Sequence, residues 1–500
     1  MIWVLAALTA AGLAAQGLRW ARVLQREHYD ARSLVRFVGR WWSPVLTPLG
    51  FLSPVVAAAV VALVVVGWGE PALLVAAVAA VLLPVGLSPR GRTGRLVYTR
   101  RCVVVITVAA VLAVAVMALA RRSDVTALVV VAAPFWLAAS AAILAPIEDR
   151  LAKRYIERAR QRLVQVGPTV IGITGSYGKT STKNHLLDVL APTRGVVATP
   201  KSFNNRAGLS RAISENLVDG TTVFIAEMGT YGPGEISAMT AWCPPRISVI
   251  TAIGPVHLER MKSLEVIERA KFEITKGAEI VVVNVDDERL HHWPAKLAPG
   301  TTVWTAGSVH EADVRVVRDG DEWVVTARGH TLRAPVTTSA QPTNVACALA
   351  AGLALGDDLD GLVARLANLR PVEHRSQAVR AASGVWVIDD TFNANPASAA
   401  ASLALLRETP ANGRRVVVTP GMVELGHLQR EANAQLAATA RADGAELVIV
   451  GRTNARALAA GYGEGARRVA RRDQAVAWVR ENLRDGDAVL YLNDLPDNYP

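Results

Sequence analysis

Glycines, hydroxyl side chains and a lysine stand together in the segment Gly172–Ser181, which reads GITGSYGKTS. The segment lies between a β-rich run and a predicted helix, which is the context that a phosphate-binding loop requires. Gly175 and Gly178 would let backbone N–H groups turn inward around phosphate oxygens, and Lys179 would neutralise the β- and γ-phosphates. Thr180 would ligate Mg²⁺. The spacing is unusual, since five residues rather than four separate the first glycine from Gly178.

Three further side chains are candidates to hold metal ions near this loop. Glu227 ends the predicted strand Thr222–Ala226, at the carboxyl edge where α/β sheets bind ligands. His257 follows the predicted strand Ile247–Thr251, and Lys271 lies fourteen residues later on a predicted helix. Singly, they have ordinary interpretations as a surface carboxylate, a packed or capping histidine and a solvated lysine. Together with the phosphate loop they predict a Mg·ATP site.

The elements that must position these residues form a βαβ pattern that begins at Thr169 and predicts a parallel, doubly wound α/β sheet. Residues Val314–Val336 predict short strands with a turn, as a small antiparallel appendage. Pro371–Ser376 predicts a hinge, after which a second α/β unit begins. The predicted strands of the two units are Val170–Thr174, Gly195–Thr199, Thr222–Ala226, Ile247–Thr251 and Ile280–Val285, then Val385–Asp389, Arg415–Thr419, Glu446–Val450 and Ala488–Leu492.

Residues 1–150 are different, because they hold long apolar runs almost without charge. Spanning a bilayer takes about 20 apolar residues, and the runs therefore predict a helical transmembrane domain of about five spans, with a buried helical bundle as the alternative. The third run is marginal and could form a re-entrant hairpin with the second. The runs are Ile2–Leu18, Phe51–Trp68, Ala72–Leu87, Cys102–Ala120 and Val125–Ile147.

Arginines set the expected orientation of these spans. They crowd the loops after the first run and before the fourth, whereas the opposite loops carry only Arg121 and Arg122. The positive-inside rule then places the N-terminus outside and everything after Ile147 in the cytoplasm. A charged connector at 151–168 would follow, lying on anionic lipid or solvated as a plain helix.

Composition narrows the remaining classes of function. The net charge is +11. The sequence has no basic stripe interleaved with aromatic residues, which is the pattern that would predict a nucleic-acid groove. The three cysteines, Cys102, Cys243 and Cys347, form no CxxC pair, which argues against a zinc knuckle or a disulfide framework. The apolar spans hold almost no ionisable residue, which argues against a transporter.

Five ordered motifs resemble the Mur ligases, ATP-dependent amide ligases of cell-wall synthesis, and most closely their D-alanyl-D-alanine-adding type. The resemblance covers roughly Thr169 to the C-terminus and implies a central ATPase domain at 169–370 and a Rossmann-like C-terminal domain at 371–500. The motifs are GITGSYGKTST, FNNRAGLSRAI, AEMGTYGPGEI, AIGPVHLERMKSLEVIERAKFEI and DDTFNANPASAAASL.

The resemblance also implies roles for single residues. Thr180, Glu227, His257 and Lys271 would bind two Mg²⁺ ions, with Lys271 carbamylated so that it acts as a carboxylate. Lys179 would act with these ligands in catalysis. The nucleotide would contact Gly175, Ser176, Gly178, Lys179, Thr180, Ser181, Asn344, Arg375 and Asp390, and the substrates would contact Asn204, Asn205, Asn393 and Asn395. Without the resemblance, Asn344 reads as a helix cap, Arg375 as a hinge cation and Asn393–Pro396 as a turn.

The chemistry that the resemblance implies is amide-bond formation through an acyl-phosphate. ATP phosphorylates a muropeptide carboxylate, and the amine of an amino acid or dipeptide, with D-Ala-D-Ala the first choice, displaces the phosphate. The membrane helices stand where Mur ligases normally carry a UDP-binding domain. We therefore expect a membrane-associated or lipid-linked acceptor, or one presented by a partner such as another cell-wall enzyme.

The sequence also departs from the family pattern in places. Thr343 and Cys347 replace a histidine and an asparagine of the nucleotide helix, and Val489–Asp497 replaces a lysine-glycine-serine stretch. Two other functions therefore stay open. One is a membrane-associated ligase for another peptide polymer, such as poly-γ-glutamate. The other is a non-catalytic nucleotide-binding scaffold for wall synthesis.

Overall fold

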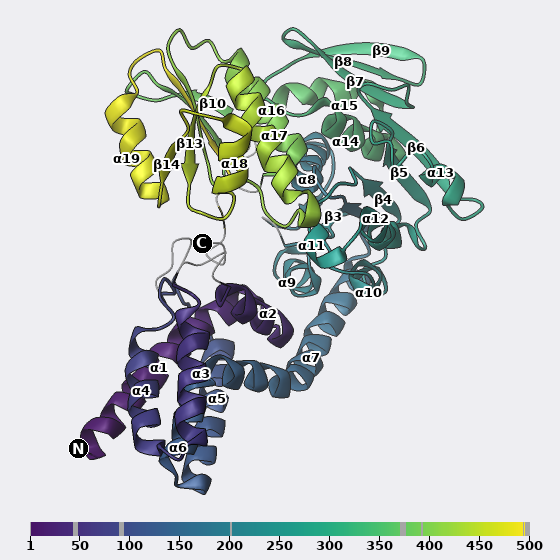
Figure 1. Cartoon of the computed structure of the whole chain (residues 1–500). Helices are drawn as coiled ribbons and strands as arrows, with labels where there is room; N and C mark the ends of the chain where they lie inside the picture. The colour runs from purple at the N-terminus through teal and green to yellow at the C-terminus, as the bar shows by residue number, and fades with distance from the viewer. Residues whose placement is uncertain are drawn as a thin grey trace. The chain divides into compact units, whose positions relative to one another are not determined.

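The computed structural model describes residues 2–43, 49–89, 95–200, 203–370, 377–391, 394–493 and 495. The chain forms two compact units (Figure 1). One consists mainly of Met1–Leu151 and is helical. The other holds Ala152–Val450 with Asn454–Asp494 and carries both α/β sheets. The predicted hinge at Pro371–Ser376 lies outside the described residues.

The helical unit contains the apolar runs, and many of its large side chains face outward. Trp3, Val65 and Leu119 are 87%, 79% and 85% exposed, which is unusual for a bundle that stands in water. Asp30 and Thr99 cap two of the helices by accepting from the backbone N–H groups of Ser33 and Cys102. The helices are α1 Ile2–Arg26, α2 Ala31–Trp41, α3 Leu52–Val65, α4 Gly69–Leu82, α5 Arg100–Ala120, α6 Ser123–Val131 and α7 Ala133–Val166.

Helix length separates these segments into two classes. By length and composition, α1 from Trp3 and α5 could each cross a membrane, and α6 with α7, bent by 72°, would add a third span. The helices α3 and α4 have 14 residues each, or about 21 Å at 1.5 Å per residue, which is shorter than a hydrocarbon core of about 30 Å. The prediction of five full spans is therefore not confirmed for the described residues, and a re-entrant hairpin of α3 and α4 stays a prediction.

The connector is the end of α7 and packs one side on protein. Its Ala159 and Leu163 are buried against the central domain near Leu217. Arg162 Nε also donates to the carbonyl oxygen of Leu217 at 3.1 Å. Most of its other residues are exposed, and contact of this side with solvent or anionic lipid stays a prediction.

The central domain is built on a nine-stranded sheet in the order β2-β3-β1-β4-β5-β6-β7-β8-β9. Pairing is parallel from β2 to β7 and antiparallel from β7 to β9. The predicted antiparallel appendage is thus a continuation of the main sheet through β6, a strand that the sequence did not predict. The strands are β1 Thr169–Thr174, β2 Val196–Ala198, β3 Val223–Glu227, β4 Ile247–Ile250, β5 Ile280–Asn284, β6 Thr302–Gly307, β7 Val314–Asp319, β8 Glu322–Ala327 and β9 His330–Pro335.

Helices cover both faces of this sheet, which confirms the doubly wound prediction. Helices α8 and α14 bury one face, and α9, α10 and α12 bury the other. Strands that are covered on both faces carry apolar side chains on both faces. Ile171 and Val282 are buried on one face of this sheet, and Phe224 is buried on the other. The helices are α8 Lys179–Leu190, α9 Arg206–Asn216, α10 Glu235–Thr240, α11 Leu258–Met261, α12 Leu264–Phe272, α13 Trp293–Lys296, α14 Pro342–Ala354 and α15 Leu359–Ala364, with short 3₁₀ turns η1 Glu273–Thr275 and η2 Arg365–Asn368.

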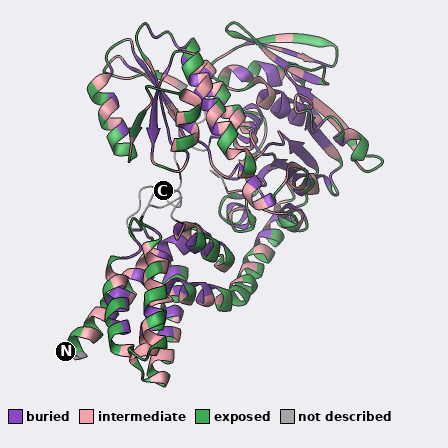
Figure 2. Ribbon diagram, viewed as in Figure 1, coloured by how far each residue is buried: buried purple, intermediate pink, exposed green. Residues whose placement is uncertain are grey.

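The C-terminal domain has a six-stranded sheet in the order β10-β11-β15-β12-β13-β14, parallel except for the edge strand β10. Figure 2 shows the central strands of both sheets as buried, and the β8–β9 hairpin and the outer helix faces as largely exposed. Strands β12, β13 and β15 have the predicted bounds. The elements are β10 Gln377–Arg380, β11 Trp386–Asp390, α16 Pro396–Glu408, β12 Arg415–Thr419, η3 Gly426–Leu428, α17 Gln429–Ala442, β13 Glu446–Val450, α18 Ala455–Tyr462, β14 Arg467–Val469, α19 Arg472–Asn482 and β15 Ala488–Leu492.

Candidate active site

The glycine-rich loop connects the end of β1 to the start of α8, as a phosphate loop does. Gly178 has φ +79°, and a Cβ there would lie 2.3 Å from Asn344 Oδ1. A Cβ at Gly175 would lie 2.0 Å from Thr251 Oγ1. Only glycine fits at these two positions, so the loop can press its backbone closely against its neighbours.

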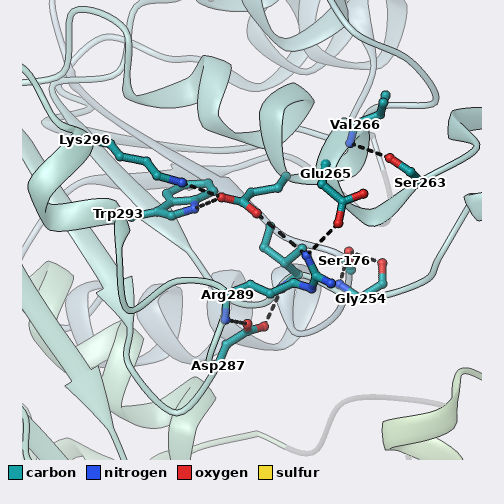
Figure 3. A network of polar contacts seen from close by, with 11 residues as sticks. Ser176, Gly254, Ser263, Glu265, Val266, Asp287, Arg289, Trp293 and Lys296 are labelled. Atoms are coloured by element: carbon teal, nitrogen blue, oxygen red, sulfur yellow. Dashed lines mark hydrogen bonds and ion pairs between the residues drawn. The ribbon is translucent and has the colours of Figure 1, made fainter.

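The loop is docked on the segment that follows β4. Ser176 Oγ donates to the carbonyl oxygen of Gly254 at 3.0 Å and accepts from its N–H at 2.9 Å (Figure 3). Asp287 accepts from the N–H of Ile253 at 2.6 Å, and this hydrogen bond fixes the segment after β4. In the same network Arg289 reaches Glu265 on α12, the helix that carries Lys271. The loop and this helix are therefore tied to one scaffold.

Two lysine side chains converge on one backbone carbonyl of the loop. Lys179 Nζ donates to the carbonyl oxygen of Gly175 at 2.7 Å, and Lys271 Nζ donates to it at 3.0 Å. Lys271 is buried, and its burial, together with the charge of Lys179, lowers the pKa of Lys271 well below the usual range. Lys179 places a positive charge beside the loop, where an anion would be stabilised, while the Lys271 amine is shifted toward its neutral form.

Glu227 ends β3 at the carboxyl edge of the sheet and is 1% exposed. One carboxylate oxygen accepts from Thr180 Oγ1 at 3.0 Å and from Lys183 Nζ at 3.2 Å. The other oxygen accepts from Asn204 Nδ2 at 3.1 Å. A threonine hydroxyl beside a carboxylate at a phosphate loop provides hard oxygen donors of the kind that Mg²⁺ prefers.

His257 precedes α11 with φ +60°, a strained conformation for a residue that is not glycine. Its ring packs on the ring of Tyr231 with centroids 4.5 Å apart. Its Nδ1 makes a short hydrogen bond to the carboxylate of Glu424, which comes from the C-terminal domain. His257 is thus held from both domains of the α/β unit.

The loop lies between two cavities. One is lined by Gly175, Ser176, Lys179, Asn204, His257 and Lys271, among others. The second encloses about 250 Å³ and is lined by Tyr177, Gly178, Ser181, His185, Thr251, Ala252, Asn284, Thr338, Ser339, Ala340, Gln341, Thr343, Asn344, Arg370, Asp390, Asn395, Ala397, Ser398 and Ala401. A nucleotide in the larger cavity would direct its phosphates across the loop toward the smaller one.

Comparison with known proteins agrees with this geometry. The family model of the Mur ligase middle domain matches residues 173–352, and that of the Mur ligase glutamate ligase domain matches residues 374–492. The chain is also 36% identical over 436 residues to the UDP-N-acetylmuramoyl-tripeptide–D-alanyl-D-alanine ligase of Mycobacterium tuberculosis strain H37Rv, across 75% of this chain and 81% of the relative.

The chain belongs to the Mur ligase family. The corresponding ligase of Bacillus subtilis is 28% identical over 358 residues, across 69% of this chain and 75% of that protein. Among solved structures, MurF ligase from Thermotoga maritima in complex with ADP superposes with a TM-score of 0.60 at 25% identity, covering 69% of this chain and 80% of that one. As a Mur ligase, the chain is an ATP-dependent ligase.

The predicted nucleotide residues of this Mur ligase divide between the two cavities. Asn344 lies in the larger one beside Gly178 and accepts from Thr182 Oγ1 at 3.4 Å. Helix α14 has Gln341 as its N-cap, so the interpretation of Asn344 as a cap is wrong. Asp390 also lines this cavity and accepts from Ser402 at 2.7 Å. Arg375 lies outside the described residues.

The predicted substrate residues have mixed positions. Asn204 lines the smaller cavity and holds Glu227. Asn205 is exposed and caps α9 by accepting from the N–H of Gly208. Asn395 lines the larger cavity and also caps α16, so its interpretation as a local structural residue holds beside the functional one. Asn393 lies outside the described residues.

The predicted metal ligands do not form one cluster of acidic and imidazole groups. Among the described residues, no three His, Cys, Asp or Glu side chains are arranged to hold an ion. Thr180 and Glu227 form one pair, while His257 and Lys271 face the smaller cavity. The residues present fit one Mg²⁺ at the pair, and a second cation would need a donor that the unmodified side chains do not supply.

Several residues of the Mur ligase site escaped prediction. Lys183 is buried beside Glu227 and lies one helical turn after Lys179, a spacing that could have revealed it. His185 lies one turn after Ser181 and lines the larger cavity. Its Nδ1 has no hydrogen-bond partner among the described residues, and burial lowers its pKa to about 4. Arg370, which also lines this cavity, pairs with Asp188 of α8 at 2.5 Å.

Proposed function

We propose that this Mur ligase joins D-alanyl-D-alanine to the carboxylate of a cell-wall muropeptide at the inner face of a bacterial cytoplasmic membrane. The observation that carries the proposal is the cavity that Lys179, Asn204, His257 and Lys271 share beside the phosphate loop. The likeness to ligases named for this reaction, 36% identity across 81% of one relative, supports the choice of substrates.

The chemistry follows from the poor reactivity of a carboxylate toward amines. A carboxylate oxygen of the acceptor attacks the γ-phosphorus of ATP, the bond to the bridging oxygen breaks, and ADP leaves. The amine of the incoming dipeptide then attacks the acyl carbon, and phosphate leaves with the electron pair of the C–O bond. Lys179 at the loop stabilises the charge of the transferring phosphoryl group, to which Mg²⁺ supplies further electrostatic stabilisation.

Lys271 is proposed to be carbamylated in the working enzyme. Burial and the neighbouring Lys179 lower the pKa of its amine, which favours the neutral form that attack on CO₂ requires. Carbamylation would also place an anion beside the Lys179 ammonium and create the oxygen donor that a second cation needs. We expect Lys271→Ala to lose activity and to regain part of it with a short carboxylate such as acetate or propionate. The same loss without any rescue would argue for a purely structural lysine.

The helical unit is proposed to be a multi-pass membrane domain with its N-terminus outside. The exposed apolar side chains of α1, α3 and α5 support this, as does the arginine asymmetry of the loops. An enzyme held at the membrane would meet a lipid-linked acceptor directly, whereas a UDP-linked acceptor would arrive from solution. We therefore extend the proposal to a lipid-linked muropeptide acceptor.

Phosphate release by the full-length protein in detergent tests these proposals. D-Ala-D-Ala or single amino acids would be offered with lipid-linked or UDP-linked muropeptide, and Lys179→Met would serve as the inactive control. Release that needs D-Ala-D-Ala and a muropeptide supports the ligase assignment, and a preference for the lipid-linked form supports the membrane acceptor. Release with glutamate oligomers alone would indicate a polymer synthase, and ADP binding without any turnover would indicate a scaffold.

A further inference from the structure

Helix α2 of the helical unit has two sharply different sides. Its 11 residues read ARSLVRFVGRW, which is too few to cross a bilayer, since a span needs about 20. Its buried residues are Ser33, Leu34, Phe37, Val38 and Trp41. The arginines lie on the other side. A helix with aromatic and aliphatic residues on one side and basic residues on the other is typical of helices that lie at a membrane surface.

The apolar side of α2 is fixed to the ends of two longer helices. The ring of Phe37 packs edge-on against Trp20 with centroids 6.1 Å apart, and it stacks on Trp41 at 5.6 Å. Trp20 lies near the end of α1, and the same apolar cluster holds Cys102 and Val105 at the start of α5. Figure 1 shows α2 at the end of the helical unit opposite the α5–α6 connection. In the proposed orientation this is the inner end of the unit.

The outward side of α2 carries arginines at one-turn spacing. Arg32, Arg36 and Arg40 follow one another at intervals of four residues, which places them in one row of the helix. Arg32 and Arg36 are exposed, and among the described residues neither is paired with a carboxylate. The guanidinium of Arg36 donates to the hydroxyl oxygen of Ser33 at 2.8 Å. The protein therefore leaves the charges of Arg32 and Arg36 without an anionic partner in the part of the chain that the structure describes.

The acidic residues next to this row are engaged or buried. Asp30 caps α2 by accepting from the N–H of Ser33 at 2.6 Å, and Glu27 is 9% exposed. The sequence holds six arginines but only these two acidic residues from Arg19 to Arg40. Clusters of four to eight basic residues directly after a membrane-spanning helix are typical of segments that bind anionic lipids.

An apolar residue on the same exposed side favours the edge of a bilayer over open water. Val35 is 45% exposed and lies between Arg32 and Arg36 in the sequence, and the spacing puts all three on one side of the helix. Arginine has a long apolar stem, so its guanidinium can reach a headgroup while the stem and Val35 contact acyl chains. Trp42, at the C-cap of α2, is of the residue type that is enriched at membrane interfaces.

We infer that α2 binds the headgroups of anionic phospholipids in the inner leaflet through Arg32 and Arg36. The phosphate oxygens of such lipids supply the anionic partner that the two side chains lack, and a guanidinium pairs with phosphate through two parallel hydrogen bonds. The inference rests on the proposed membrane placement of the helical unit, but not on the identity of the muropeptide or the amine. It gives the ligase a lipid partner in addition to its substrates.

Native mass spectrometry of the full-length protein in detergent tests this inference. Dioleoyl phosphatidylglycerol would be titrated, with the zwitterionic dioleoyl phosphatidylcholine for comparison. We expect the affinity for phosphatidylglycerol to fall about 5-fold in Arg32→Gln or Arg36→Gln and about 30-fold in the double variant, and the affinity for phosphatidylcholine to stay the same. Arg32→Lys with Arg36→Lys keeps both charges and should keep most of the binding. Arg430→Gln with Arg468→Gln, at exposed arginines of the C-terminal domain, is the control and should bind as the wild type does.

A second set of measurements separates headgroup binding from folding and from binding of other anions. The double glutamine variant should melt at the wild-type temperature in phosphatidylcholine, because both side chains are exposed. Inorganic pyrophosphate, added at the concentration of the lipid, should not displace phosphatidylglycerol. Displacement would assign the arginines to a diphosphate group instead and overturn the lipid assignment.

Two results of the lipid titrations would also overturn the inference. One is equal affinity of the wild type for the two lipids, and the other is unchanged affinity of the double glutamine variant for phosphatidylglycerol. Failure of every muropeptide to be ligated, with the preference for phosphatidylglycerol intact, would refute only the proposed substrates. Absence of binding of either lipid would refute the membrane placement together with the inference.

Discussion

At the scale of single residues, the site depends on charged groups that the fold keeps out of water. Lys183 and Glu227 are 2% and 1% exposed and lie 3.2 Å apart, so neither can lose its partner without leaving an isolated buried charge. Thr180 and Asn204 donate to the same carboxylate. These bonds hold Glu227 in one arrangement at the phosphate loop.

His185 allows a prediction about stability and pH. Burial lowers its pKa in the folded state to about 4, against about 6.5 in an unfolded chain. As the pH falls from 6.5 to 4, the unfolded state therefore binds a proton that the folded state does not. We expect the free energy of unfolding to fall across this window by up to about 3 kcal/mol from this group alone.

The measurement compares thermal unfolding of the wild type and of His185→Met in detergent from pH 7.5 to pH 4. The wild type should lose more stability than the variant over that range, because only the wild type carries this histidine. His330→Gln, at an exposed position of β9, is the control and should follow the wild type. Parallel pH profiles of the wild type and His185→Met would contradict the prediction.

At the scale of elements, the strand-loop-helix unit β1–α8 brings the chemistry to one place. The sheet is parallel, so the carboxyl ends of β1, β3 and β4 meet at one edge, where the loop, Glu227 and the segment before His257 all begin. Helix α14 then closes the larger cavity from another part of the sequence, through Asn344. The order of the strands in the sheet therefore matters as much for assembling the site as the types of the residues do.

Gly178 gives a prediction for this element. In Gly178→Ala the new Cβ would meet the amide of Asn344 in addition to the strain of φ +79°, so we expect ADP affinity to fall at least tenfold, as measured by calorimetry. Gly220 also has a positive φ, +85°, but nothing lies near a Cβ at that position. Gly220→Ala should therefore lower the free energy of unfolding by about 1 kcal/mol through backbone strain, while ADP affinity stays at the wild-type value. Equal ADP affinity in the two variants would mean that the loop tolerates a side chain.

At the scale of the whole molecule, one helix joins the apolar helices to the ligase. Helix α7 begins in the helical unit and ends packed on the central domain. The proposed orientation puts the α5–α6 connection outside the cell and both α/β domains inside.

Labelling in intact cells tests that orientation. The native cysteines are all buried, so an added cysteine can be followed with a membrane-impermeant maleimide. We expect Arg121→Cys, at the exposed start of the α5–α6 connection, to react in intact cells. Val309→Cys, 74% exposed in the central domain, should react only after lysis. The reverse pattern would invert the topology, and labelling of both positions only after lysis would argue against an external connection.

The sequence was sufficient wherever a property is local or periodic. Short β-rich runs between helical segments predicted most of the parallel strands, and the spacing of glycines and Lys179 predicted the loop at the end of β1, because short-range sterics and local composition decide these features. The same logic failed for β6, β10 and β14. Strands β10 and β14 are short and lie at the two edges of their sheet, whereas β6 lies inside its sheet and is held by pairing with β5 and β7 rather than by its own pattern.

Long-range packing alone decided how the site is completed. No local pattern indicates that Lys271 and Lys179 share one carbonyl, or that Glu424 meets His257 across 167 residues of sequence. Such contacts depend on how two sheets and their helices pack, which the chain fixes only when the cores form. The sequence therefore determined the phosphate loop and its family, and the tertiary structure decided which side chains surround it.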